Sequence, residues 1–74
     1  MRHIAILSHS LERAKYFIQN SLQGLEQMPV SVAHLDQLRG WRDGIIIILP
    51  DTTYDIRDSY ILSNNLVIDL NAIR

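Results

Sequence analysis

The stretch Ile45-Ile46-Ile47-Ile48-Leu49-Pro50 decides how this chain folds. It contains five consecutive apolar residues, four of them β-branched, and a proline ends it. β-branched side chains favour strands, and an apolar run without polar alternation is typical of a parallel strand covered on both faces. The stretch therefore predicts a central parallel strand over residues 45–49.

Upstream of this strand, the sequence predicts a first strand and a long helix. Residues 4–7 form a short apolar run that ends abruptly at Ser8, as a buried strand does. From Leu11 onward the apolar residues recur every three or four positions, which places them on one side of a helix. Ser8 or Ser10 can cap that helix, which ends in a left-handed cap at Gly24 or continues to residue 27 before Pro29.

Residues 30–35 predict a second strand, with Asp36 capping a helical turn that runs through Leu38. After the central strand, we expect a helix over residues 53–63, capped by Asp51 or Thr52, and a fourth strand over residues 66–70. The alternative pairs residues 60–62 with 66–68 as a hairpin, because Asn64-Asn65 can adopt the positive φ angles of a tight turn. The helix is the favoured reading.

Strands that alternate with helices predict an α/β fold built from right-handed crossovers. We expect one small domain over residues 1–74, in two or three layers. Its sheet should have about four mostly parallel strands in the order 2-1-3-4, like half of a doubly wound Rossmann or flavodoxin-like domain. The core of a chain of 74 residues supplies only about 3–5 kcal/mol of net stability. Contact with a second copy or another partner would therefore stabilise the fold further.

Composition excludes several classes of function. The chain has no cysteine, which rules out disulfides, thiolate metal sites and a cysteine nucleophile. Its formal net charge of −1 argues against binding nucleic acid by bulk electrostatics. The apolar run over residues 4–7 is too short for a signal peptide or a membrane span, so we expect a cytoplasmic protein. The three histidines lack metal-ligand spacing, and no cofactor-binding motif occurs, so neither metal nor cofactor is expected.

Polar residues should gather where the parallel strands end, which is the carboxyl edge of the sheet. The start of the long helix there favours an anion such as phosphate, and His9 could act as a nucleophile or general base. Asp51 could orient the imidazole ring of His9. The residues of this candidate phosphate or anion site are Ser8, His9, Ser10, Asp51 and Thr52.

The stretches IAILSHS and GIIIILPDT resemble the first and third strands of mannose-type phosphotransferase-system IIA domains. That resemblance implies that His9 accepts a phosphoryl group and that Asp51 supports it. The likeness covers only these two stretches of a longer domain, and the family's glycine-rich turn after the aspartate is absent. The strand followed by Ser-His also resembles the start of TIR-type domains, although the glutamate that nucleotide hydrolysis needs has no counterpart.

The segment Arg39-Gly40-Trp41-Arg42 is a second candidate site, for a partner. Tryptophan and arginine are enriched at binding hot spots and can stack on bases. Trp41 could equally close one end of the core while both arginines stay in water. Because Asp36 and Asp43 flank the segment and the chain has a single lysine, nucleic acid is not favoured; such binding would depend steeply on salt.

The favoured function is a small non-enzymatic protein-interaction or regulatory module that associates with itself or with a protein partner. One long helix and short helical segments leave part of a parallel sheet uncovered. The outer strands, at residues 30–35 and 66–70, could each add a strand from a second chain. The alternative is a phosphate- or nucleotide-handling domain that uses His9 and Asp51. Catalysis is not favoured, because a chain this short has little volume for a deep pocket.

Overall fold

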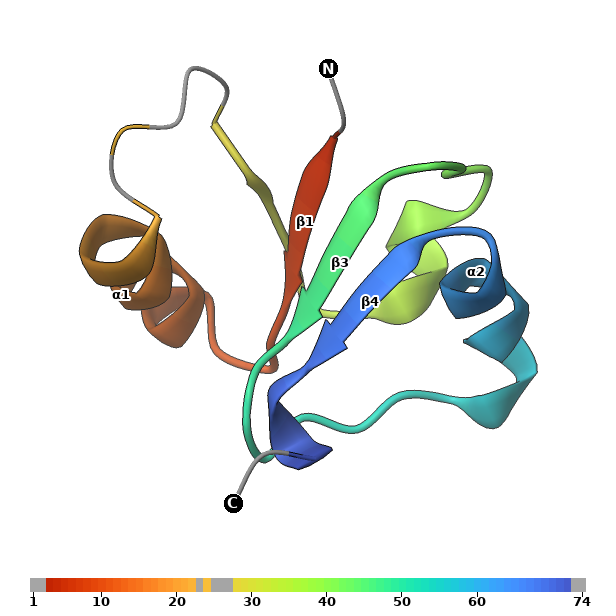
Figure 1. The fold of residues 1–74 in the computed structure, drawn as a ribbon. Helices are drawn as coiled ribbons and strands as arrows, with labels where there is room; N and C mark the ends of the chain where they lie inside the picture. Colours follow the sequence, from red (N-terminus) through yellow and green to blue (C-terminus); the bar gives the residue numbers. More distant parts are fainter. Residues whose placement is uncertain (1–2, 23, 25–27, 73–74) are drawn as a thin grey trace.

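The computed structural model describes residues 3–22, 24 and 28–72 and has a small α/β fold (Figure 1). The strands are β1 (Ile4–Leu7), β2 (Val30–Val32), β3 (Ile45–Ile48) and β4 (Leu66–Asp69). All neighbouring strands are parallel, and their order is β2-β1-β3-β4, which confirms the predicted sheet. The helices are α1 (Leu11–Ser21) and α2 (Ser59–Ser63), with the shorter 3-10 helices η1 (Leu35–Leu38), η2 (Ile56–Asp58) and η3 (Leu70–Ala72).

The isoleucine run forms the centre of the sheet, as predicted. Ile47 lies beside Ile6 of β1 on one side and beside Ile68 of β4 on the other. Ile46 and Ile48 are fully buried. An outward-facing polar residue is unnecessary in β3, because side chains cover both of its faces.

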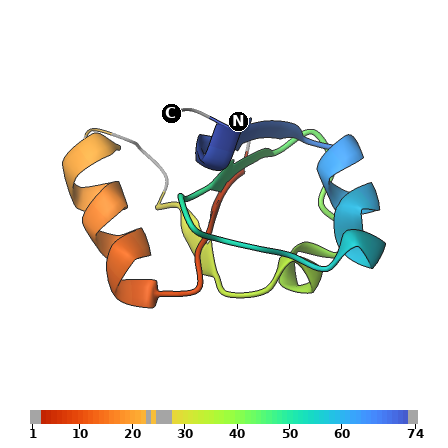
Figure 2. The same ribbon diagram turned by 90° about the horizontal axis from the view of Figure 1, so that it is seen from below.

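Two apolar clusters hold the sheet, one on each face, and Figure 2 shows α1 and α2 on opposite sides of it. We call the two sides the α1 face and the α2 face. On the α2 face, η1 and α2 cover a cluster of Ala5, Leu7, Val32, Leu35, Leu38, Ile46, Ile48 and Ile61. On the α1 face, α1 contributes Ala14 to a cluster with Ile6, Ile47 and Leu49.

Helix α1 begins as predicted and ends earlier. The Ser10 hydroxyl accepts a hydrogen bond from the Arg13 N–H, so Ser10 is the cap. The last helical residue is Ser21, and Gly24 then adopts a left-handed conformation with φ of +85°. The helix therefore ends before Gly24, whereas the left-handed conformation expected at Gly24 is confirmed; residue 27 lies outside the described residues. Within the described part of the chain, neither α-helix has the length and apolar character that a membrane crossing requires.

The second strand is shorter than predicted, because the Gln37 side chain competes for its backbone. Gln37 Oε1 accepts hydrogen bonds from the N–H groups of Ala33, at 3.0 Å, and His34, at 2.9 Å. These contacts turn the chain into η1 directly after Val32, so a strand over residues 33–35 is wrong. Asp36 lies inside η1 rather than at its cap, which is His34.

The segment after β3 is helical, and the hairpin alternative is wrong. The helical part begins later than predicted, with η2 and α2, because residues 52–55 belong to neither a helix nor a strand. Neither Asp51 nor Thr52 caps it. The Asp55 carboxylate accepts from the Arg57 N–H and guanidinium, and these hydrogen bonds lower the pKa of Asp55 to about 2. The predicted third and fourth strands each end one residue early, at Ile48 and Asp69.

Candidate functional site

The carboxyl edge brings two of the predicted segments together. Because β1 and β3 are parallel neighbours, the residues that follow them meet at one edge of the sheet. The backbone N–H of Thr53 donates to Nε2 of His9 at 3.0 Å, and Thr53 Oγ1 lies 3.1 Å from the same nitrogen. His9 and Thr53 are 44 positions apart in the chain, so only the sheet topology creates this contact.

The hydroxyl groups at this edge are used within the loop itself. Ser8 is buried, and its Oγ accepts from the Ser10 N–H at 3.2 Å. The Ser10 hydroxyl is the cap of α1. Thr52 is also buried, and its Oγ1 lies 3.5 Å from the Pro50 carbonyl. The two serine hydroxyls therefore satisfy backbone donors that an anion would otherwise contact.

Asp51 has a different place from the one expected. Within the described residues, its carboxylate makes no hydrogen bond with His9. The ring is instead held by the backbone N–H of Thr53. The backbone of Asp51 has φ of +62°, a left-handed conformation that is uncommon for a residue with a side chain. Asp51 therefore lies at a turn of the chain two residues before Thr53, which contacts His9.

Asn71, which follows β4, holds that turn in place. Its Oδ1 accepts from the Asp51 N–H at 2.7 Å. Its Nδ2 donates to the carbonyls of Thr52, at 3.1 Å, and Leu49, at 3.3 Å. One amide side chain therefore satisfies three backbone groups of the turn, and it positions the contact between Thr53 and His9 indirectly.

The contact with Thr53 limits what His9 can do chemically. A ring nitrogen that accepts from a backbone N–H has its lone pair engaged, so Nε2 is not available to attack a phosphoryl group while the Thr53 contact is made. Nδ1 then carries the ring hydrogen. The described residues contain no group of three or more His, Cys, Asp or Glu side chains arranged to hold a metal ion.

We expect His9 to populate the Nδ1–H tautomer in the folded protein at a pH where the ring is neutral. The reason is that Nε2 must present a lone pair to the Thr53 N–H. Long-range nitrogen–proton correlation NMR distinguishes the two tautomers. The same chain in denaturant is the control, since the preference should vanish on unfolding. A folded-state ring with its hydrogen on Nε2 would contradict the geometry.

The Arg39-Trp41-Arg42 segment lies at the opposite, amino edge of the sheet. Trp41 is partly buried against the α2-face cluster, and its ring lies 5.6 Å from the His3 ring at 56°. Arg39 and Arg42 are exposed. A hollow of about 380 Å³ is lined by His3, Gly40, Trp41 and Arg42. The two candidate sites therefore cannot form one site.

Asn65, which precedes β4, holds the amino edge as Asn71 holds the other. Its Oδ1 accepts from the Gly44 N–H at 2.8 Å. Its Nδ2 donates to the carbonyls of Ile61, at 2.7 Å, and Trp41, at 3.1 Å. The indole reaches close to Gly44, where an added Cβ would lie 3.0 Å from Trp41 Cε3. This arrangement favours a structural role for Trp41.

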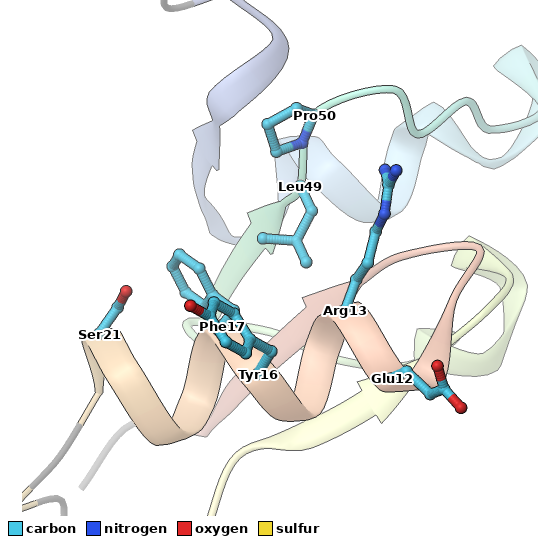
Figure 3. Close-up of a pocket in the computed structure, with 7 residues that line it drawn as sticks. All are labelled: Glu12, Arg13, Tyr16, Phe17, Ser21, Leu49 and Pro50. Atoms are coloured by element: carbon cyan, nitrogen blue, oxygen red, sulfur yellow. The ribbon is translucent and has the colours of Figure 1, made fainter.

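An apolar groove of about 520 Å³ runs between α1 and the end of β3 (Figure 3). Tyr16 and Phe17 of α1 line one side, and Leu49 with Pro50 lines the other. Figure 3 shows the Arg13 side chain reaching toward Pro50 and Glu12 turned away. Phe17 packs in the α1-face cluster, so the groove belongs to that face.

The outer strand β4 has an uncovered side. Leu66 and Ile68 are 52% and 41% exposed and point to the α1 face, whereas Val67 packs on the α2 face. Their neighbours in β3 are Ile45 and Ile47, which contribute to the α1-face cluster. We call the side chains of Leu66 and Ile68, together with the outer backbone edge of β4, the β4 surface. It contains the largest aliphatic side chains left exposed on the sheet itself.

Sequence reasoning identified β4 as an open edge and did not predict the contacts that Thr53, Asn65 and Asn71 make. The asparagines resemble ordinary turn residues in the sequence, and their three-fold contacts depend on loops that are distant in the chain. The exposure of Leu66 and Ile68 also carries no local signal, since their apolar character is the same as that of β3. Comparisons of this chain with protein-family models, with curated proteins and with solved structures find no match.

Proposed function

We propose that this protein is a small non-enzymatic interaction module that binds another protein chain at the β4 surface. The observation that carries the proposal is the half-exposed pair Leu66 and Ile68 on the open strand of the sheet. Parallel sheets normally have both faces covered, because burial of such side chains stabilises a protein by roughly 1.5–3 kcal/mol each. A chain bound beside β4 would bring its own side chains against Leu66 and Ile68 and remove part of their surface from water.

The backbone of β4 supports the same proposal. The Leu66 N–H donates to the Gly44 carbonyl, toward β3. Backbone groups alternate in direction along a strand, so Val67 and Asp69 direct theirs away from the sheet. An extended segment of another chain can pair with these groups by strand addition.

The carboxyl edge supports phosphate handling less well. Its serine hydroxyls are engaged in capping, and Nε2 of His9 accepts from Thr53. Nucleophilic use of that nitrogen would first require the contact to break. Calorimetry with inorganic phosphate tests this alternative. If the wild type bound phosphate and His9→Ala did not, the functional site would be the carboxyl edge.

The test of the interaction proposal compares two isoleucine variants. Ile68→Lys places a charge on the β4 surface, whereas Ile56→Lys changes the 81% exposed Ile56 of η2, which follows the loop after β3. Native mass spectrometry of gently purified protein measures which chains stay bound. We expect Ile68→Lys to reduce the fraction of protein with a bound chain at least ten-fold. Ile56→Lys should leave that fraction unchanged.

Circular dichroism should show that both variants remain folded, since both positions are solvent-accessible. Equal binding by wild type and Ile68→Lys would refute a role for β4. Equal loss in both variants would point to a nonspecific effect of the added charge and would likewise refute it.

A further inference from the structure

We infer that the chain bound at the β4 surface is a second copy of this protein, paired antiparallel through β4 about a two-fold axis at Val67. This inference rests on the proposed function, because it names the partner for the same surface. The resulting sheet has eight strands, with β4 of each copy at the centre. Its support comes from the symmetry of the strand, from its backbone and from the contrast with β2.

A two-fold axis perpendicular to a sheet keeps each face on its own side. Residues directly opposite each other in an antiparallel pair share a face, so the side chains of Leu66 and Ile68 must meet side chains of the α1 face of the partner. With Val67 on the axis, Leu66 lies opposite Ile68 of the second copy, and this pair occurs twice. These are the two half-exposed aliphatic side chains of the strand.

The residues on either side of the axis match chemically. The sequence over residues 65–69 is Asn-Leu-Val-Ile-Asp, which is polar at both ends and apolar between them. Antiparallel pairing at Val67 therefore places Asp69 opposite Asn65 of the second copy, and the two Asp69 carboxylates stay apart. A shift of the axis to Ile68 would place Val67 opposite the Asp69 carboxylate. The Val67 register alone pairs apolar residues with apolar ones and polar residues with polar ones.

The outward backbone groups fit this register. Val67 would exchange two hydrogen bonds with Val67 of the second copy, as residues of a hydrogen-bonded antiparallel pair do. The N–H of Asp69 would donate to the carbonyl of Asn65 in the second copy. The Asn65 N–H is not required, and it is already donated to the Leu62 carbonyl.

The other edge of the sheet is protected, so assembly stops at two copies. β2 has three residues and is preceded by a proline, which has no N–H to donate. After β2, Gln37 already occupies the N–H groups of Ala33 and His34. Strand addition at both edges would give a fibre, whereas one open edge gives a closed dimer.

The contact is small, because β4 has four residues. Such an interface lies at the low end of the size range for specific complexes, so we expect a dimer of micromolar or weaker affinity. Sedimentation velocity should show the weight-average mass rising toward twice the chain mass with concentration. Ile68→Lys should remain monomeric under the same conditions, and Ile56→Lys should behave as wild type.

Single cysteines test the register, since the chain has none of its own. Leu66→Cys and Ile68→Cys are purified separately and then oxidised alone or as an equimolar mixture. In the Val67 register, positions 66 and 68 of different copies have Cα atoms about 4.5 Å apart, within reach of a disulfide. We expect the mixture to form disulfide-linked dimers at least five-fold faster than either variant alone, and Ile56→Cys to give the background rate.

Faster linking of Ile68→Cys alone would place the axis at Ile68 and overturn the Val67 register. A purified chain that stays monomeric at millimolar concentration would overturn the second copy as partner. If that monomer still lost a bound protein through Ile68→Lys, the proposed function would stand without this inference. If Ile68→Lys weakened neither the dimer nor the binding of another protein, both the proposed function and this inference would be wrong.

Discussion

Replacement of Asn65 with alanine is expected to lower the free energy of unfolding by about 2–4 kcal/mol, because it leaves several partly buried backbone groups without partners. The amide contacts the Gly44 N–H and the carbonyls of Trp41 and Ile61. A methyl group replaces none of these three hydrogen bonds. For a domain of this size, the loss corresponds to a fall in melting temperature of roughly 10–25 °C. Chemical denaturation and thermal melting both measure it.

The neighbouring Asn64 provides the matched control. Its side chain is exposed and makes one hydrogen bond, from Nδ2 to the Tyr60 carbonyl at 3.1 Å. We expect Asn64→Ala to cost no more than about 1 kcal/mol. Equal destabilisation by the two substitutions would mean that the contacts of Asn65 with Gly44 and Trp41 contribute little.

Asn71→Ala is expected to destabilise the protein by about 1–3 kcal/mol and to loosen the carboxyl edge. The substitution frees the Asp51 N–H and the carbonyls of Leu49 and Thr52. Asp51 then has less to hold it at a positive φ, so the turn can relax and move Thr53 away from His9. Chemical denaturation measures the change in stability. The tautomer of His9, measured by NMR, reports whether Thr53 has moved away from the ring.

Asn20→Ala is the control for this experiment, because Asn20 is an exposed asparagine of α1 with one hydrogen bond to the Tyr16 carbonyl. It should change the free energy of unfolding by at most about 1 kcal/mol and leave the tautomer of His9 unchanged. A full Nδ1–H preference in Asn71→Ala would show that the turn keeps its shape without the amide. The positioning role of Asn71 would then be wrong.

Local chemistry explains why the strands and the first helix could be predicted. The run over residues 45–48 is too apolar and too β-branched for any place other than the middle of a parallel sheet. Ser10 is a strong cap that precedes a regular apolar spacing. Alternation of strands and helices then leaves few topologies, and the order β2-β1-β3-β4 is one of them.

Two of the errors occurred where a side chain competes with the backbone for hydrogen bonds. Gln37 shortens β2, and Asp55 rather than Asp51 or Thr52 begins the helical segment after β3. Several polar residues near each boundary could cap, and the choice among them depends on which reaches a free N–H in the folded chain. Propensity does not contain that information.

The sequence by itself determined the strands, their parallel order and the start of α1, because these depend on short-range apolar patterns and on capping. Only the tertiary structure decided that Thr53 meets His9, that Asn65 and Asn71 hold the loops at the two ends of β3, and that β4 has an uncovered α1 face. Each of these features joins residues distant in the chain or depends on the area that a helix covers. Such distances and areas exist only once the sheet has formed.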